Sequence, residues 1–306
     1  MNKFAVVTDS AADIPVDLAQ KLDIRIVPLH VTFMGRDYRD GEDISTAGLL
    51  DLMRGAETLP QTSQPTPADF LEVYQQLYDE GYTQVLSIHL SRELSSTIES
   101  ARAIAGRIPE GARLEVVDSC SATVAQGAMV LEAAVMAQHG ATLDEALKRV
   151  EDIRAGYSIL FVPDTLDNLV KGGRATKMQG LVTSLLNIKI VAGLNSAGGI
   201  EVLHKAKGAK GAKGAVSYIA KHVAKLVQER GAQVCYLLHT DAEPHVRAIE
   251  DALLRVGAKV RVLTDATIGP VIATHVGEGA FGIFCYPEAL HSSELDGVSE
   301  YLTPEF

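Results

Sequence analysis

Phe4-Ala5-Val6-Val7-Thr8, at the start of the chain, is a continuous apolar run that leads directly into the polar turn Asp9-Ser10. Such a run is typical of a strand buried on both faces of a parallel sheet. Gln84-Val85-Leu86-Ser87-Ile88 has the same character, and the segments 15–22 and 67–79 between the two runs have helical patterns. Strands that alternate with helices predict a parallel, doubly wound sheet.

The rest of the first half continues this alternation. We expect a strand over 25–33, a short helix over 51–53, a helix over 96–108, a strand over 114–117 and a helix that ends near His139. The second half begins with a helix over 143–155 and a strand over 157–162. Beyond it we expect helices over 166–170, 179–186, 216–230 and 244–256, and strands over 233–238, 259–263 and 282–285.

One feature sets the second half apart. The segments 189–194 and 200–204 flank the turn Asn195-Ser196-Ala197-Gly198-Gly199, which predicts a β-hairpin. A chain of 306 residues is also longer than a single hydrophobic core usually supports. We therefore predict a two-domain α/β protein, with a doubly wound parallel sheet in an N-terminal domain, 1–155, and a mixed sheet in a C-terminal α/β domain, 156–306.

Composition narrows the function. A net charge of -11 argues against nucleic acid as a partner, because such binding depends on Lys and Arg. The basic run Lys205, Lys207, Lys210 and Lys213 is an exception, which by itself predicts a solvated loop or helix face. The three cysteines have no CxxC spacing, so we expect no disulfide framework, no metal site and a reducing, cytoplasmic location. No apolar run is long enough to span a membrane, which leaves only transient membrane contact open.

Several motifs suggest chemistry without deciding it. Asp9 could serve as an aspartyl nucleophile, but Asp13 as a cap of the next helix accounts for the same motif. The GxGxxG match at 277–282 precedes a strand instead of a helix, so we do not expect a dinucleotide loop. No cofactor is predicted. Ser95 lacks a GxSxG elbow for a hydrolase.

Hydroxyl-rich turns are better candidates for a binding site. Ser96 with Glu99 matches a capping box, which leaves Ser95 and Thr97 free to face an anion. Thr62-Ser63-Gln64-Pro65-Thr66 is a second such turn before a helix. His275, before the glycine turn at Gly277, could donate a hydrogen bond to a carboxylate, although a lone histidine is more often structural.

In this order the motifs resemble those of the DegV family of fatty-acid-binding proteins. The matching segments cover nearly the whole chain: Val7-Thr8-Asp9-Ser10 with Asp13, Ile26-Val27-Pro28-Leu29, Gly41-Glu42-Asp43-Ile44, Thr62-Ser63-Gln64-Pro65, Leu94-Ser95-Ser96-Thr97, Val117-Asp118-Ser119, Leu169 to Gly172-Gly173-Arg174, and His275 with Gly277 and Gly279.

The resemblance implies a lipid-binding protein, not an enzyme. One long-chain fatty acid would occupy an apolar tunnel, with its carboxylate held by Ser95, a hydroxyl of Thr62 or Ser63, and His275. The backbone around Ser96 and Thr97, with Gly277, would assist, and Arg174 would support. A separate fatty acid kinase would then form the acyl-phosphate for phospholipid synthesis.

Two positions depart from the family pattern. Glu278 stands where the family usually has proline, and adds a negative charge near the expected carboxylate. Lys207, flanked by Lys205 and Lys210, is the nearest match to an arginine that docks the kinase. The alternative function is a hydrolase or phosphotransferase that acts on a small anion through Asp9 or Ser95, and a third is a lipid sensor that reports to another protein.

Overall fold

The structure is a computed structural model that describes residues 4–175, 188–207 and 211–298. The first half of the chain forms a parallel sheet of four strands in the order β2-β1-β6-β7. Its strands are β1 (Phe4–Asp9), β2 (Ile24–Val27), β6 (Gln84–His89) and β7 (Arg113–Asp118). All residues of β1 are buried, as the continuous apolar run predicts.

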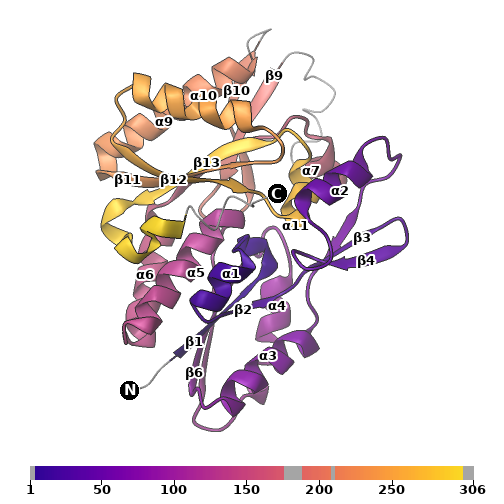
Figure 1. Ribbon diagram of the computed structural model, residues 1–306, viewed down its shortest axis with the longest axis vertical. Helices are drawn as coiled ribbons and strands as arrows, with labels where there is room; N and C mark the ends of the chain where they lie inside the picture. Colours follow the sequence, from indigo (N-terminus) through magenta and orange to yellow (C-terminus); the bar gives the residue numbers. More distant parts are fainter. Residues whose placement is uncertain (1–3, 176–187, 208–210, 299–306) are drawn as a thin grey trace.

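Helices cover both faces of this sheet, so the doubly wound arrangement is confirmed (Figure 1). One face packs on the almost wholly buried α5, beside α1 and α6, and the other on α3 and α4. Their bounds are α1 (Val16–Lys21), α3 (Pro67–Asp79), α4 (Thr97–Arg102), α5 (Thr123–Gln138) and α6 (Leu143–Gly156), with one-turn helices η1 (Ser10–Ala12) and η2 (Ala105–Arg107).

The second half forms a mixed sheet of six strands in the order β10-β9-β8-β13-β11-β12. Only the β11–β12 pairing is parallel. The strands are β8 (Ser158–Val162), β9 (Ile188–Leu194), β10 (Ile200–Lys207), β11 (Gln233–His239), β12 (Val260–Thr267) and β13 (Phe281–Pro287). The predicted hairpin is the antiparallel pair β9–β10.

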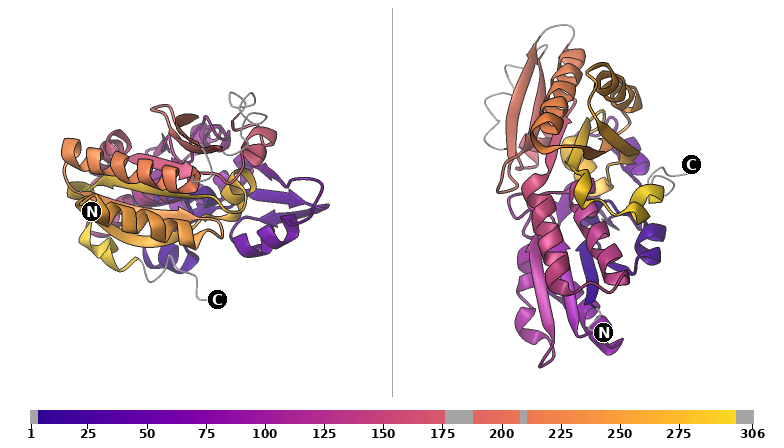
Figure 2. Two further views of the ribbon diagram at one scale, coloured as in Figure 1. Left: turned by 90° about the horizontal axis from the view of Figure 1, so that it is seen from above. Right: turned by 90° about the vertical axis from the view of Figure 1, so that its left-hand side faces the viewer.

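Helices α9 (Gly211–Arg230) and α10 (Glu243–Arg255) cover one face of the mixed sheet, and α5 and α6 lie on the other (Figure 1). The largest core cluster joins residues of both halves, from Phe4 to Leu295. The two sheets follow one another along the long axis of the molecule (Figure 2). The division at residue 155 stays a prediction, and it lies one residue before the end of α6.

A third, three-stranded sheet was not predicted. It has the order β4-β3-β5 and consists of β3 (His30–Phe33), β4 (Arg36–Arg39) and β5 (Gln61–Ser63). The single strand expected over 25–33 is therefore wrong, because the chain leaves the first sheet at Pro28 and enters this one. Helix α2 (Thr46–Met53) follows β4.

Short elements complete the described chain: α7 (Asp167–Lys171), α11 (Pro270–Val276), η4 (Glu288–Leu290) and η5 (Ser293–Val298). Helix α11 was not predicted, and the helix expected over 96–108 is the shorter pair α4 and η2. The helix expected over 179–186 lies outside the described residues. Cys235 and Cys285 are opposite one another on β11 and β13, with their Sγ atoms 2.7 Å apart.

Candidate functional site

An apolar cavity lies where the three sheets meet. About 910 Å3 of empty space lies between its walls and at its mouth, a volume that includes open solvent. Apolar side chains from distant segments make up most of its wall: Leu29, Leu90, Leu94, Ala122, Ile159, Phe161, Leu169, Leu194, Ile200, Leu238, Ile268, Val271, Ile272, Val276 and Ala280. A concave site with a mostly apolar lining is typical of sites that bind small apolar or amphipathic ligands.

Polar groups gather in one part of this wall. The structure brings together five of the residues predicted for the site: Thr62, Ser63, Ser95, Arg174 and His275. Thr62 Oγ1 lies 2.8 Å from His275 Nε2, although the two residues are 213 positions apart in the sequence. Burial, with a smaller contribution from the Arg174 guanidinium, lowers the pKa of His275 to about 4. The imidazole is therefore neutral at pH 7.

Helix α7 and the turn after it pack closely against His275. A Cβ atom on Gly172 would lie 2.6 Å from His275 Nδ1, so only glycine leaves room for the ring. Asn168 Nδ2 donates to the carbonyl of Thr274 (3.1 Å) and ties α7 to α11. His275 Nδ1 is buried and has no hydrogen-bond partner among the described residues. These contacts fix the ring so that Nε2 faces Thr62.

Arg174 adds a positive charge to the cavity wall. Its Nε donates to the Leu94 carbonyl (3.0 Å) and its Nη1 to the Gly172 carbonyl (2.6 Å). Among residues 4–175, 188–207 and 211–298, no carboxylate forms an ion pair with it. Partial burial lowers the pKa of this guanidinium. A half-buried cation without a counter-ion favours an anionic ligand nearby.

The Leu94–Thr97 turn differs from the prediction in detail. The prediction of a capping box between Ser96 and Glu99 is wrong, because Ser96 is exposed and its side chain makes no capping hydrogen bond. Ser95 Oγ instead accepts from the Thr97 amide (3.3 Å) and lies 2.9 Å from Thr97 Oγ1. Ser95 therefore both caps α4 and lines the cavity, whereas Ser96 and Thr97 do not line it.

The glycine turn links α11 to β13, so the GxGxxG match is not a dinucleotide loop. Gly277 is buried, has φ +77° and does not line the cavity. Glu278 is exposed and lies outside the cavity wall. Its carboxylate receives Arg54 Nη2 at 2.6 Å. The Arg54 guanidinium holds the pKa of Glu278 below its usual value, and the pair neutralises the charge that this position adds.

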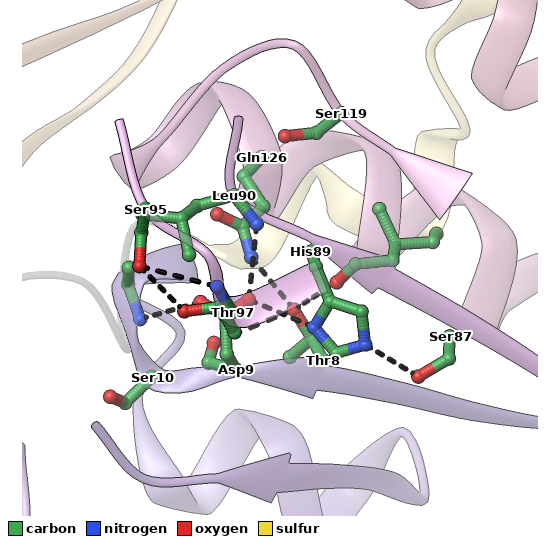
Figure 3. Close-up of polar contacts among 12 residues, drawn as sticks. Thr8, Asp9, Ser10, Ser87, His89, Leu90, Ser95, Thr97, Ser119 and Gln126 are labelled. Atoms are coloured by element: carbon green, nitrogen blue, oxygen red, sulfur yellow. Dashed lines mark hydrogen bonds and ion pairs between the residues drawn. The ribbon is translucent and has the colours of Figure 1, made fainter. Parts of the chain in front are cut away.

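Asp9 belongs to a buried polar network beside the cavity (Figure 3). Its Oδ2 accepts from the Leu90 amide (3.0 Å) and lies 2.9 Å from His89 Nδ1. Ser87 Oγ lies 2.7 Å from His89 Nε2. Asp9 is fully buried and does not line the cavity, so it has no surface to offer to a substrate. It holds the start of the loop that carries Ser95.

Asp13 does not cap the following helix, contrary to the prediction. Helix α1 has Pro15 at its N-cap position and no side-chain capping bond. Asp13 instead ends η1 in a left-handed conformation, with φ 51°. Burial raises the pKa of its carboxyl group well above the usual value.

The predicted docking lysines lie away from the cavity wall. Lys205 and Lys207 are exposed on β10, a strand and not the expected loop or helix face. Lys213 is exposed near the start of α9. Lys210 lies outside the described residues.

Sequence reasoning expected an apolar tunnel but did not identify the residues that line it. Its residues come from segments that are far apart in the chain, and local periodicity marks them only as core. The described residues contain no group of His, Cys, Asp or Glu that could hold a metal ion. Among the described helices, none has the length and apolar character needed to cross a bilayer.

Comparison with known proteins decides the family. The model of the DegV family, described as uncharacterised, matches residues 3–288. A DegV domain-containing protein of Listeria monocytogenes is 35% identical over 283 residues, which is 92% of this chain and 97% of the relative. The chain belongs to the DegV family.

Solved structures of other DegV proteins have the same fold. A fatty-acid-binding DegV protein from Thermus thermophilus is 35% identical and superimposes with a TM-score of 0.84, over 93% of this chain and 99% of that one. DegV from Bacillus subtilis, described as a fatty acid binding protein, is 29% identical with a TM-score of 0.81, over 94% and 100% of the two chains.

Proposed function

We propose that this DegV protein binds one long-chain fatty acid in the cavity and presents its carboxylate to a separate fatty acid kinase. The supporting observation is a single cavity wall that is aliphatic over most of its extent and carries hydroxyls, a neutral imidazole and a cation in one part. A fatty acid has the same division between tail and head. Both DegV structures compared above are described as fatty-acid-binding.

The head group would meet Thr62 and His275 first. We assign the His275 proton to Nε2, because Nδ1 has no acceptor in the part of the chain that the structure describes and an unpaired buried N–H is costly. Nε2–H then donates to Thr62 Oγ1, and the Thr62 hydroxyl keeps its own proton free to donate to the carboxylate. His275 would thus act by orienting this donor.

Ser95 and Arg174 would complete the head-group site. The Ser95 hydroxyl lines the cavity near Thr97, and Ser63 lines it beside Thr62. Arg174 would contribute its charge while its Nε and Nη1 remain bonded to carbonyls. A carboxylate taken out of water is strongly disfavoured without such donors. Ser96, Thr97 and Gly277 would have only supporting roles, since none of them lines the cavity.

The tail would supply most of the affinity. Burial of about fifteen methylene groups, at about 0.8 kcal/mol each, yields roughly 12 kcal/mol of transfer free energy before the ordering costs of binding. Most of the cavity wall is apolar, with Ile159 and Leu238 among its residues, and matches such a chain in polarity. The head group then needs only enough hydrogen-bond donors to replace the water that it loses on binding.

Phosphoryl transfer would be the task of the kinase, in the cytoplasm. The exposed Lys205 and Lys207 on β10 are the proposed docking residues for that partner, together with Lys210. Charge reversal at Lys207, Lys207→Glu, is expected to weaken kinase binding without changing fatty acid affinity. An unchanged affinity for the kinase would remove this part of the proposal.

Calorimetric titration of delipidated protein with palmitate tests the binding function. We expect one site per chain, and a large negative heat-capacity change because apolar surface is buried. Absence of any heat or displacement signal with saturated and unsaturated fatty acids alike would refute the proposed function.

A further inference from the structure

Helix α11 belongs to the C-terminal half by sequence. Asn168 of the same half donates to its Thr274 carbonyl, but side chains of the N-terminal half contact both of its ends. At its C-terminal end, His275 meets Thr62. At its N-terminal end, the Thr46 hydroxyl donates to the Ile268 carbonyl (2.7 Å), and the Val271 amide donates to Asp40 Oδ1 (3.0 Å). The position of His275 therefore depends on the side chains that hold the start of this helix.

Asp40 is the charged member of these anchors. It is only 3% exposed, and its Oδ2 accepts from the Ser10 hydroxyl at 2.6 Å. Ser10 Oγ in turn accepts from the Leu29 amide (2.9 Å), so Asp40 links α11 to two further segments.

No cation compensates the Asp40 carboxylate among the described residues. Burial, with a smaller contribution from Asp9 and against the hydrogen bonds from Ser10 and Val271, raises the pKa of Asp40 to about 6. A buried carboxylate is costly, and at pH 7 it is mostly ionised and a strong acceptor.

The bond from Asp40 to Val271 lies only one helical turn from His275. Val271 lies one helical turn before His275 and itself lines the cavity, as does Ile272. Helix α11 has only seven residues, so displacement of its first turn moves the ring at its end. A misplaced donor at a binding site costs affinity even when every residue is still present.

We propose that Asp40 is a positioning residue for ligand binding. It holds the first turn of α11 so that His275 orients the Thr62 hydroxyl for a hydrogen bond to the ligand's carboxylate. The inference rests on the proposed function and adds a residue that does not line the cavity. The proposal concerns the head group of the ligand, because the tail would contact mainly the apolar wall that lies outside α11.

Affinities of wild type and variants for palmitate and for hexadecanol test this proposal, since the two ligands share a tail and differ in the head group. Asp40→Ala is expected to weaken palmitate binding by about tenfold or more, and hexadecanol binding by about twofold or less. Asp40→Asn should recover most of the difference, because its amide oxygen can still accept from Val271. Asp43→Ala, an exposed position in the same loop, is the matched control.

Three outcomes overturn the inference. Equal losses for both ligands would mean that Asp40 supports only the fold, and unchanged palmitate affinity would mean that it positions nothing. Wild-type protein that binds neither ligand would refute the proposed function, and this inference with it. Should Asp40→Ala fail to fold, Ser10→Ala removes the bond to Oδ2 and tests the same hold, with the same direction expected.

Discussion

Replacement of Thr62 by valine removes one hydroxyl while it keeps the shape of the side chain. In the unliganded protein, His275 Nε2 loses its partner at 2.8 Å, which is expected to destabilise the fold by about 1–3 kcal/mol. In the complex, the carboxylate loses a hydrogen bond to a charged group, worth about 1.5–3 kcal/mol. The dissociation constant for palmitate should therefore rise by about 10- to 150-fold.

Calorimetric titration of the delipidated variant measures this change, and urea unfolding measures the stability. Thr62→Ser is the control, because it keeps Oγ within reach of His275 and should retain most of the affinity. Thr62→Val protein that binds palmitate as tightly as wild type would refute the assignment of Thr62 as a donor to the ligand.

Three further expectations concern the same site. Burial holds the pKa of His275 at about 4, below its ordinary 6.5, so the unfolded chain binds more protons between these values. The resulting free energy of unfolding, about 3 kcal/mol, is fully present above pH 6.5 and is lost as the pH falls to 4. Urea unfolding of wild type and of His275→Gln should therefore show a larger loss of stability for wild type across this window. Gly172→Ala places a Cβ atom 2.6 Å from His275 Nδ1 and should lower both thermal stability and palmitate affinity, whereas Gly106→Ala, with open space around its Cβ, should change neither. Arg174→Gln should weaken palmitate binding more than hexadecanol binding in a competition assay, and equal effects would argue against a role for its charge.

Local sequence signals located most elements and failed where pairing is long-range. Helix α3 begins and ends as predicted, because Thr66 and Asp69 form a capping box and Pro67 occupies the first turn. Strand β4, Arg36–Arg39, has no apolar alternation and is mostly exposed, so nothing in its own sequence marks it as a strand. It exists because β3 pairs with it.

At the site too, local sequence signals identified single residues, whereas long-range contacts could not be predicted. The hydroxyl-rich turns and the glycine turn after His275 drew attention to Thr62, Ser95 and His275. The family resemblance placed these three in one site and added Arg174. The pairing of Thr62 with His275 joins residues 213 positions apart and cannot be derived from spacing. The capping box expected at Ser96 does not form, and Ser95 Oγ instead accepts from the Thr97 amide at the start of α4. Asp40 drew no attention, since its importance depends on a contact with Val271 from the other half.

Native mass spectrometry of the protein as purified, followed by organic extraction, tests the central claim most directly. The account predicts one fatty acid per chain, released on denaturation and identified in the extract. An empty protein that also takes up no added fatty acid would contradict it.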